Sequence, residues 1–157
     1  SYLGLGNRQR SNRLRLAGYH EALREAGVDA SPAWVQVVPE GAIKAQSDTD
    51  VGQSCCPAFL GGNVSAVLCY NDRVAIGALA ACYDQGVRVP DDISIVGFDD
   101  IEAAQWVRPT LTTTRQPRLH MGRVAMDMML DLLDDHPVID RILQPQLIVR
   151  QSSAPPA

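Results

Sequence analysis

The stretch SAVLCYNDRVAIGALAACYDQGVRVPDDISIVGFDD, residues 65–100, contains two apolar runs separated by a helical pattern. Residues 65–70 and 93–98 are continuous apolar runs, which are typical of strands buried on both faces of a sheet. The intervening residues 71–86 carry apolar side chains at helical spacing and end in a glycine. A strand, a helix and a second strand in this order predict a crossover unit of a parallel sheet.

The alternation of strands and helices continues on both sides of this stretch. The expected further strands are 2–6, 34–38, 111–114 and 145–151, and the expected further helices are 12–26, 48–60, 99–107 and 117–134. Gly27 is the expected C-terminal cap of the first of these helices, and Ser47 or Asp48 is the expected N-terminal cap of the second. The predicted fold class is α/β, with a parallel sheet and helices on both of its faces.

Length and composition indicate one soluble globular domain. The chain has 157 residues, of which 46% are apolar and 20% are charged. It contains no run of about eighteen apolar residues that could span a membrane, and its first residues lack the basic and apolar regions of a signal peptide. The net charge is −4, which argues against a domain that binds DNA by itself. We therefore expect a cytoplasmic protein with no membrane partner.

Neither the cysteines nor the histidines show the spacing of a metal site. The four cysteines are Cys55, Cys56, Cys69 and Cys82, and the three histidines are His20, His120 and His136. No C-x-x-C pair occurs, and the histidines lie far apart in the sequence. We therefore expect reduced cysteines that fill the core, histidines with surface or structural roles, and neither a metal nor a cofactor.

Polar residues follow the expected strands at their carboxyl ends, which is the edge where parallel sheets bind ligands. They are Gly4–Asn7, Asn71-Asp72, Asp99-Asp100 and Thr112–Gln116. Asp72 is interpreted as the N-cap of the following helix, and Asp99 has the spacing of a capping box with Glu102. Asn71 precedes the expected cap, so its amide is predicted to offer a donor and an acceptor to a ligand.

The first strand and helix do not form a nucleotide-binding motif. The dinucleotide fingerprint G-x-G-x-x-G begins with Gly4 and Gly6, but Gln9 replaces its third glycine. No G-K-[ST] phosphate loop occurs, and no serine or cysteine nucleophile stands beside a histidine at a recognisable spacing. Arg15 in the following helix is either a solvated residue or a ligand contact.

A metal-dependent phosphotransfer site is the remaining enzyme interpretation. Asp72, Asp99 and Asp100 could supply its carboxylates at the edge of the sheet. Such a site usually includes a lysine at the same edge, whereas Lys44 lies in a predicted loop away from these strand ends. A binding protein without catalytic residues is therefore favoured, and the phosphotransfer enzyme is the less favoured alternative.

Ordered motifs along the chain resemble those of the lactose/galactose repressor family of bacterial transcription regulators. SNRLRLAGYHEAL (11–23) is similar to the family's S-x-R-x-x-G-[FYW] segment, and SAVLCYNDRVAIGAL (65–79) is similar to its T-A-x-x-x-x-N-D-x-x-A-x-G-A segment. GVRVPDDISIVGFDD (86–100) resembles G-x-x-V-P-x-D-[IV]-[SA]-[IV]-x-G-[FY]-D-[DN], and PTLTTTRQP (109–117) resembles P-x-L-T-T-[VI]-x-Q. The segments MGRVAMDMMLDLL and PQLIVRQSS resemble the family's closing helix and strand, so the resemblance covers nearly the whole chain.

The resemblance implies a two-lobed fold like that of periplasmic sugar-binding proteins, with an effector bound between the lobes. It assigns Arg15 as a hydrogen-bonding fork for effector hydroxyls or a carboxylate. It assigns Asn71 and Asp99 as contacts to effector hydroxyls, and Gln116 as a residue of the crossover between the lobes. The family's stacking aromatic residue is missing from the segment AIKAQSDTD, and Trp34 comes too early to replace it, so a sugar acid or another polyol is an alternative to a sugar ring.

The resemblance also implies a division of the chain. Residues 1–114 and 145–151 correspond to the second lobe, residues 115–144 to the crossover and a helix that packs in the first lobe of relatives, and residues 152–157 to a tail. The family's helix-turn-helix head, hinge helix and most of its first lobe are absent, so operator DNA would be contacted only through that head. The methionine-rich stripe of helix 117–134 is then expected to pack against a second copy or to fold back.

The predicted function is effector sensing and dimerisation in a bacterial DNA-binding regulator, and in a repressor in particular. The family's dimer face implies Ile76, Trp106 and Val107 as contacts of a homodimer. A small-molecule effector biases the angle between the lobes and thereby changes operator affinity. A periplasmic sugar-binding protein of the same fold is the alternative, and a signal peptide on the whole gene would favour it.

Overall fold

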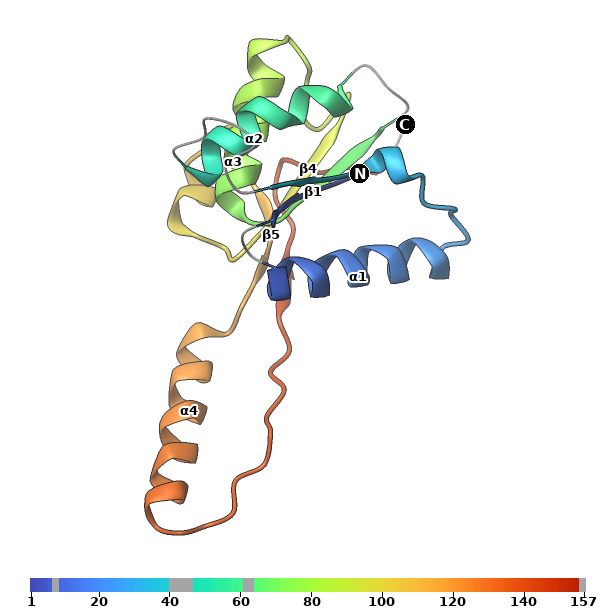
Figure 1. Cartoon of the computed structure of the whole chain (residues 1–157). Coiled ribbons are helices and arrows are strands. Elements are labelled where there is room, and N and C mark those ends of the chain that lie inside the picture. Colours follow the sequence, from blue (N-terminus) through green and yellow to red (C-terminus); the bar gives the residue numbers. More distant parts are fainter. Residues whose placement is uncertain (7–8, 40–46, 61–63, 156–157) are drawn as a thin grey trace.

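The computed structural model describes residues 1–6, 9–39, 47–60 and 64–155, and within them six strands form one sheet. In sheet order the strands are β2 (Val35–Val38), β1 (Tyr2–Leu5), β3 (Ala66–Cys69), β4 (Ser94–Phe98), β5 (Thr112–Arg115) and β6 (Gln146–Ile148). The first five are parallel, whereas β6 pairs antiparallel with β5. The chain leaves β5 and returns to β6 at the same end of the sheet (Figure 1), which makes the last strand antiparallel. The expected parallel sheet is therefore confirmed, with one antiparallel edge strand.

Helices cover both faces of the sheet, as the sequence predicts. The helices are α1 (Gln9–Glu25), α2 (Asp48–Cys55), α3 (Asp72–Asp84) and α4 (Arg118–Leu133), with short 3-10 turns η2 (Pro32–Trp34), η3 (Cys56–Phe59) and η4 (Glu102–Gln105). Helices α2 and α3 lie on one face and α1 lies on the other (Figure 1). No helix in the described part of the chain is long and apolar enough to cross a membrane.

The ends of α1 and α2 follow from local sequence. Gly27 has a φ of 69° after the end of α1, which confirms the predicted glycine cap. Ser47 Oγ accepts a hydrogen bond from the Asp50 N–H at 3.2 Å, and the Asp50 carboxylate accepts one from the Ser47 N–H at 2.9 Å. This capping box begins α2. The expected helix over 48–60 is interrupted because Pro57 has no N–H to donate, and the chain continues as the 3-10 turn η3.

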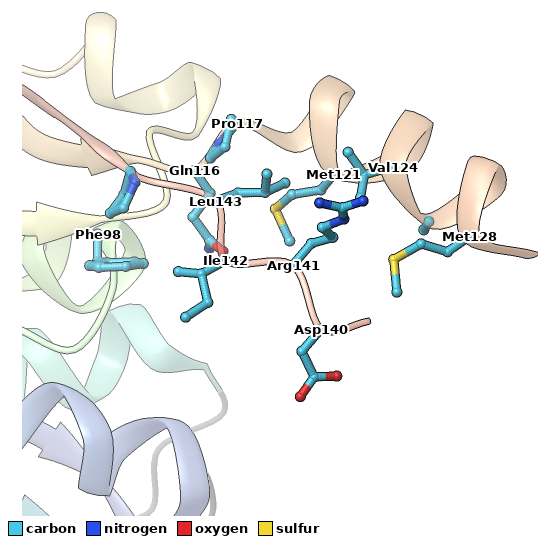
Figure 2. A pocket seen from close by; sticks show the side chains of 12 residues that line it. Phe98, Gln116, Pro117, Met121, Val124, Met128, Asp140, Arg141, Ile142 and Leu143 are labelled. Carbon is cyan, nitrogen blue, oxygen red and sulfur yellow. The ribbon is translucent and has the colours of Figure 1, made fainter. Parts of the chain in front are cut away.

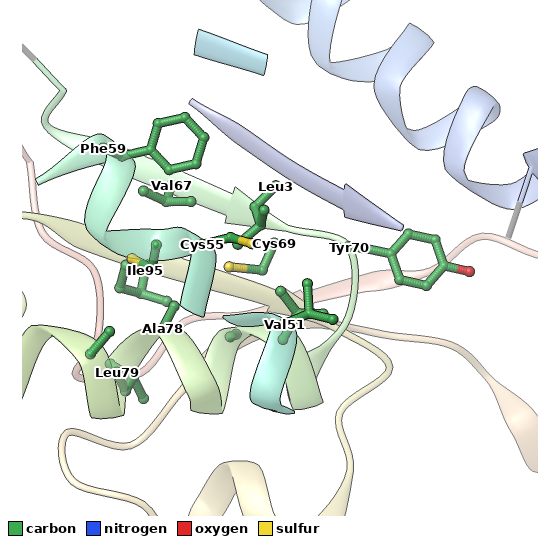
Figure 3. Close-up of a cluster of buried hydrophobic side chains, with 14 of the residues drawn as sticks. Leu3, Val51, Cys55, Phe59, Val67, Cys69, Tyr70, Ala78, Leu79 and Ile95 are labelled. Carbon is green, nitrogen blue, oxygen red and sulfur yellow. The ribbon is translucent and has the colours of Figure 1, made fainter. Parts of the chain in front are cut away.

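The hydrophobic core lies between the sheet and the layer formed by α2 and α3. Figure 3 shows Val67 and Cys69 of β3 and Leu3 of β1 packed beside side chains of the two helices. All four cysteines are free and buried in this core, which confirms that they fill the core as predicted. The core therefore occupies the face of the sheet opposite α1.

Helices α2 and α3 pack backbone against backbone. A Cβ atom added at Gly52 would overlap the carbonyl oxygen of Val74, and one added at Gly77 would overlap the carbonyl oxygen of Thr49. The two glycines therefore allow a separation that no larger residue permits. This contact fixes the position of α3, whose first turn carries candidate site residues.

Helix α4 extends away from the sheet together with the chain that returns from it, residues 134–145 (Figure 1). None of its residues is buried. The methionine-rich stripe is exposed to solvent, with exposed fractions of 53% for Met126, 57% for Met129 and 74% for Leu133. The stripe does not fold back onto the sheet, and its packing against a second copy stays a prediction.

The segment after β4 differs from the sequence prediction. A helix is expected from Asp99, but η4 begins only at Glu102 with Ile101 as its cap residue and no capping side chain. Asp99 and Asp100 have φ values of 110° and 49°. These positive values are incompatible with the first turn of a right-handed helix. The interpretation of Asp99 and Glu102 as a capping box is therefore wrong.

Candidate functional site

Arg15 of α1 lies at the carboxyl-terminal edge of the sheet, beside the ends of β3 and β4. Its Nη1 donates a hydrogen bond to the carbonyl oxygen of Tyr70 at 2.6 Å. Its guanidinium carbon lies 4.4 Å from the centre of the Tyr70 ring and 3.9 Å from the centre of the Phe98 ring. Cation–π contacts with two rings hold the guanidinium in one place. The alternative of a solvated helix residue is therefore wrong for Arg15, whose side chain is only 20% exposed.

Asp99 connects Arg15 to Gln116. Gln116 Nε2 donates to Asp99 Oδ1 at 2.7 Å, and Arg15 Nη2 lies 3.8 Å from the same oxygen. We call these three linked side chains the polar chain. The Asp99 side chain is 33% exposed, so the polar chain is accessible to solvent. The structure thus brings together three of the four predicted effector contacts, from α1, the end of β4 and the end of β5.

Asn71 is the N-cap of α3, which corrects the sequence prediction. Its Oδ1 accepts the Val74 N–H at 2.9 Å, and its Nδ2 donates to Asp48 Oδ2 at 2.7 Å. Its backbone has the extended conformation of a cap residue, so α3 begins one residue earlier than expected. An amide group can make four hydrogen bonds, and these two contacts use two of them.

Asp72 is not a cap, although the sequence suggests one. Its side chain is fully buried and accepts the Ile101 N–H at 2.8 Å and the Thr113 hydroxyl at 2.5 Å. Burial raises the pKa of the Asp72 carboxyl, and the hydrogen bonds from Thr113 and Ile101 oppose that rise. Asp72 therefore joins the start of α3 to the segment that follows β4 and also to β5.

Asp100 binds two arginines near the crossover to α4. Its Oδ2 accepts from Arg115 Nε at 2.5 Å, and its Oδ1 accepts from Arg150 Nη2 at 2.7 Å. Burial alone would raise the pKa of Asp100, but the hydrogen bonds from Arg150 and Arg115 bring it below its ordinary value. The three aspartates considered for a phosphotransfer site thus have separate partners. In the described residues, no group of three His, Cys, Asp or Glu side chains is arranged to hold a metal ion.

Four further residues belong to the cluster formed by Arg15, Asn71, Asp99 and Gln116 but were not predicted: Ser11, Asp48, Tyr70 and Phe98. The Ser11 and Tyr70 hydroxyl oxygens lie 2.7 Å apart, which fixes the Tyr70 ring beside Arg15. Tyr70 directly precedes the N-D pair and Phe98 directly precedes the D-D pair, and this shared position is a signal that the sequence does contain. Asp48 has no such signal, because its contact depends on how α2 packs over α3.

A pocket of about 560 Å³ adjoins the cluster, between α4 and the returning chain (Figure 2). It shares Phe98 and Gln116 with the cluster, whereas Arg15, Asn71 and Asp99 do not line it. Its other lining residues are Pro117, Met121, Val124, Ala125, Met128, Asp140, Arg141, Ile142, Leu143 and Pro145. Most of these side chains are apolar, so the pocket is a surface of α4 and not the polar site that the motifs predict.

The predicted dimer contacts differ in exposure. Trp106 is 67% exposed, just after η4. Ile76 of α3 and Val107 are partly buried and pack against the core. Of the three, Trp106 therefore offers the largest apolar surface to a second copy.

Comparison with known proteins identifies the class. Residues 2–153 match the family described as periplasmic binding protein-like domain, and the chain belongs to this family. Its relatives are LacI-family transcriptional regulators. The HTH-type transcriptional regulator GalR of Escherichia coli is 37% identical over 147 residues, which cover 91% of this chain and 41% of GalR.

Solved structures agree with this assignment. A LacI family transcriptional regulator from Mycobacterium smegmatis has a TM-score of 0.81 and 30% identity, over 100% of this chain and 58% of that chain. A complex of the transcriptional regulator CelR with cellobiose has a TM-score of 0.84 and 27% identity, over 98% of this chain and 46% of that chain. The chain therefore spans less than two thirds of each of these relatives.

Proposed function

We propose that this chain is the effector-binding and dimerisation region of a cytoplasmic DNA-binding repressor. The observation that carries the proposal is the polar chain formed by Arg15, Asp99 and Gln116, with Arg15 held between two aromatic rings. The relatives, which are transcriptional regulators, support it. Operator DNA is contacted by a part of the regulator outside this chain.

The charges at the site favour a neutral polyhydroxylated effector. The positive charge of Arg15 lies beside the negative charge of Asp99, and Asp48 adds a second carboxylate next to Asn71. A carboxylate or phosphate on the effector would be repelled by these two side chains. A sugar or a nucleoside carries no such charge, and the CelR relative was solved with cellobiose.

A pair of neighbouring hydroxyl groups fits the polar chain. Such a diol accepts hydrogen bonds from Arg15 and Gln116 and donates one to Asp99. The two rings already hold the guanidinium, so binding orders few side chains and loses little conformational entropy. Asn71 lies beside Tyr70 and offers its remaining amide positions to a further hydroxyl.

Effector binding reaches the crossover through Gln116. This residue precedes the first residue of α4 by two positions, and α4 is proposed to pack in the other lobe of the regulator. An effector that contacts Gln116 and the other lobe together favours one angle between the lobes. That preference changes the affinity for operator DNA by linkage.

Calorimetric titration of the full-length protein tests the proposal. The probes are cellobiose, D-galactose, D-ribose and cytidine, with galacturonate and glucose 6-phosphate as anionic counterparts. We expect binding of a neutral probe, and at least a tenfold weaker affinity in Arg15→Lys and Asp99→Asn, because each removes a hydrogen bond to a charged group. Arg24→Lys changes an exposed arginine of the same helix and is the matched control. Unchanged affinity in both site variants would refute the site.

The homodimer is tested separately by light scattering of the full-length protein. Trp106→Glu places a charge in the proposed interface and is expected to produce a monomer. Leu14→Glu places the same charge on an exposed position of α1 and is expected to leave the dimer intact. A dimer in both variants would show that the interface lies elsewhere.

A further inference from the structure

The proposed site does not use Asp72, although this residue carries a fully buried carboxylate. Asp72 is the first residue of α3, and its side chain reaches away from its own helix. Its two acceptor contacts go to Ile101, in the segment after β4, and to Thr113 of β5. A carboxylate buried without strong partners destabilises a protein, so this placement needs a structural reason.

Gly97 of β4 makes room for this carboxylate. A Cβ atom at position 97 would overlap Asp72 Oδ1, so any larger residue would displace the carboxylate from Ile101 and Thr113. The N-D motif after β3 and the G-F-D-D motif of β4 thus meet at one point. The contact links segments that are 29 and 41 residues apart in the sequence.

The segment held by Asp72 has an unfavourable backbone. Asp99 and Asp100 have φ values of 110° and 49°, in the region that favours glycine. Each such residue raises the energy of the folded chain, so surrounding contacts must hold it. Three donors of this segment are held: Asp99 N–H by the Thr114 carbonyl at 2.9 Å, Asp100 N–H by Thr113 Oγ1 at 3.4 Å, and Ile101 N–H by Asp72.

We propose that Asp72 is the positioning residue of the effector site. Its buried carboxylate, seated over Gly97, holds residues 99–101 so that the Asp99 side chain faces Gln116 and Arg15. Without this anchor the segment relaxes to negative φ values and the Asp99 carboxylate turns away from both partners. The inference rests on the proposed function, because the strained backbone at Asp99 and Asp100 holds a residue of the proposed effector site.

The negative charge of Asp72 is part of this role. A carboxylate accepts both the Ile101 N–H and the Thr113 hydroxyl proton. In Asp72→Asn the amide group can still accept from Ile101, but its N–H donor then faces Thr113, whose own proton loses its acceptor. The isosteric change therefore removes the positioning contact with little change of volume.

Nuclear magnetic resonance of the ligand-free full chain tests the inference. In Asp72→Asn we expect shifted backbone amides at Asp99 and Ile101 and shifted side-chain Nε2 resonances of Gln116. Hydrogen exchange of the Ile101 amide should become at least tenfold faster. The amides in the second half of α3, residues 78–84, should keep their shifts and their protection.

Two further variants separate positioning from general stability. Gly97→Ala perturbs the same carboxylate from β4 without touching its charge, and it should reproduce the pattern at Ile101 and Gln116. Ser94 lies at the other end of β4, and its hydroxyl exchanges hydrogen bonds with the backbone of Ala154. Ser94→Ala removes this hydroxyl and should leave the resonances of Ile101 and Gln116 unchanged.

The outcome that overturns the inference is specific. If Asp72→Asn and Gly97→Ala lower thermal stability but leave residues 99–101 and Gln116 unchanged, Asp72 is only a stabilising residue. Thr113→Val keeps the size of its side chain and removes one of the two donors, so it tests the same contact if the other variants do not fold. Because no ligand is used, this result is independent of whether the site binds a sugar.

Discussion

Helices α3 and α4 have similar apolar content and opposite surroundings. Most residues of α3 are buried between α2 and the sheet, whereas no residue of α4 is buried. Small residues let α3 approach its neighbours, while α4 carries methionines and leucines that face solvent. An apolar stripe therefore predicts that a helix will pack, but not whether its packing surface lies in the same chain.

The largest effect on stability is expected from a substitution that breaks the α2–α3 contact. Gly77→Ala places a methyl group against the Thr49 carbonyl, and α2 and α3 must separate. We expect a loss of about 3 kcal/mol in the free energy of unfolding, because overpacking against backbone cannot be relieved by a rotamer change. Urea unfolding followed by circular dichroism measures it.

A glycine-to-alanine substitution in α4 is the control, and it is expected to change the stability in the opposite direction. Nothing lies within 4 Å of a Cβ atom added at Gly122. Gly122→Ala should therefore raise stability by about 0.5–1 kcal/mol, since alanine is the better helix former. Destabilisation of similar size by both variants would show that α4 is packed as tightly as α3.

The next effect concerns the junction between the two regions. Asp100 binds Arg115, which precedes α4, and Arg150, which follows β6. Asp100→Asn should lower stability by about 2 kcal/mol at pH 7, because a buried ion pair loses one partner. The partly exposed Arg115 keeps the effect from being larger.

The difference in stability between the wild type and Asp100→Asn should depend on pH, because only the wild type carries the Asp100 charge. The pKa of Asp100 is lower in the folded chain than its ordinary value. Its contribution is therefore fully present above about pH 4 and is lost as the pH falls through the folded pKa. The stability difference between the wild type and Asp100→Asn should narrow below pH 4. A constant difference from pH 7 to pH 3 would contradict this account.

A smaller effect is expected at the strained backbone of Asp99. Asp99→Gly and Asp99→Ala both remove the contacts with Gln116 and Arg15, but only glycine adopts a φ of 110° readily. Asp99→Gly should therefore be more stable than Asp99→Ala by about 1 kcal/mol. Equal unfolding midpoints in urea would show that the segment relaxes without strain.

The smallest effect is expected on the exposed face of α4. Met129→Lys should change the stability of this chain by no more than about 0.5 kcal/mol, because the side chain is 57% exposed. Val74→Ala in α3 removes two buried methyl groups and should lower stability by about 2 kcal/mol. If Met129→Lys instead dissociates a dimer in light scattering, the stripe packs against a second copy.

The fold was largely predictable because its signals are local. Continuous apolar runs indicate β3 and β4, and Gly27 marks the end of α1. The convergence of Arg15, Asp99 and Gln116 at one edge was predictable, since the carboxyl ends of parallel strands meet there, whereas their role as effector contacts stays a prediction. The direction of β6 was not predictable, because it depends on the path of the chain through α4.

The sequence by itself determined the order of strands and helices, the burial of the cysteines and the edge of the sheet where polar groups gather. These properties depend on side-chain periodicity and on residues within a few positions of one another. Only the tertiary structure decided that Asn71 caps α3 while Asp72 reaches Ile101 and Thr113. The choice between two neighbouring polar residues depends on donors supplied by distant segments, and those donors come together only when the sheet has formed.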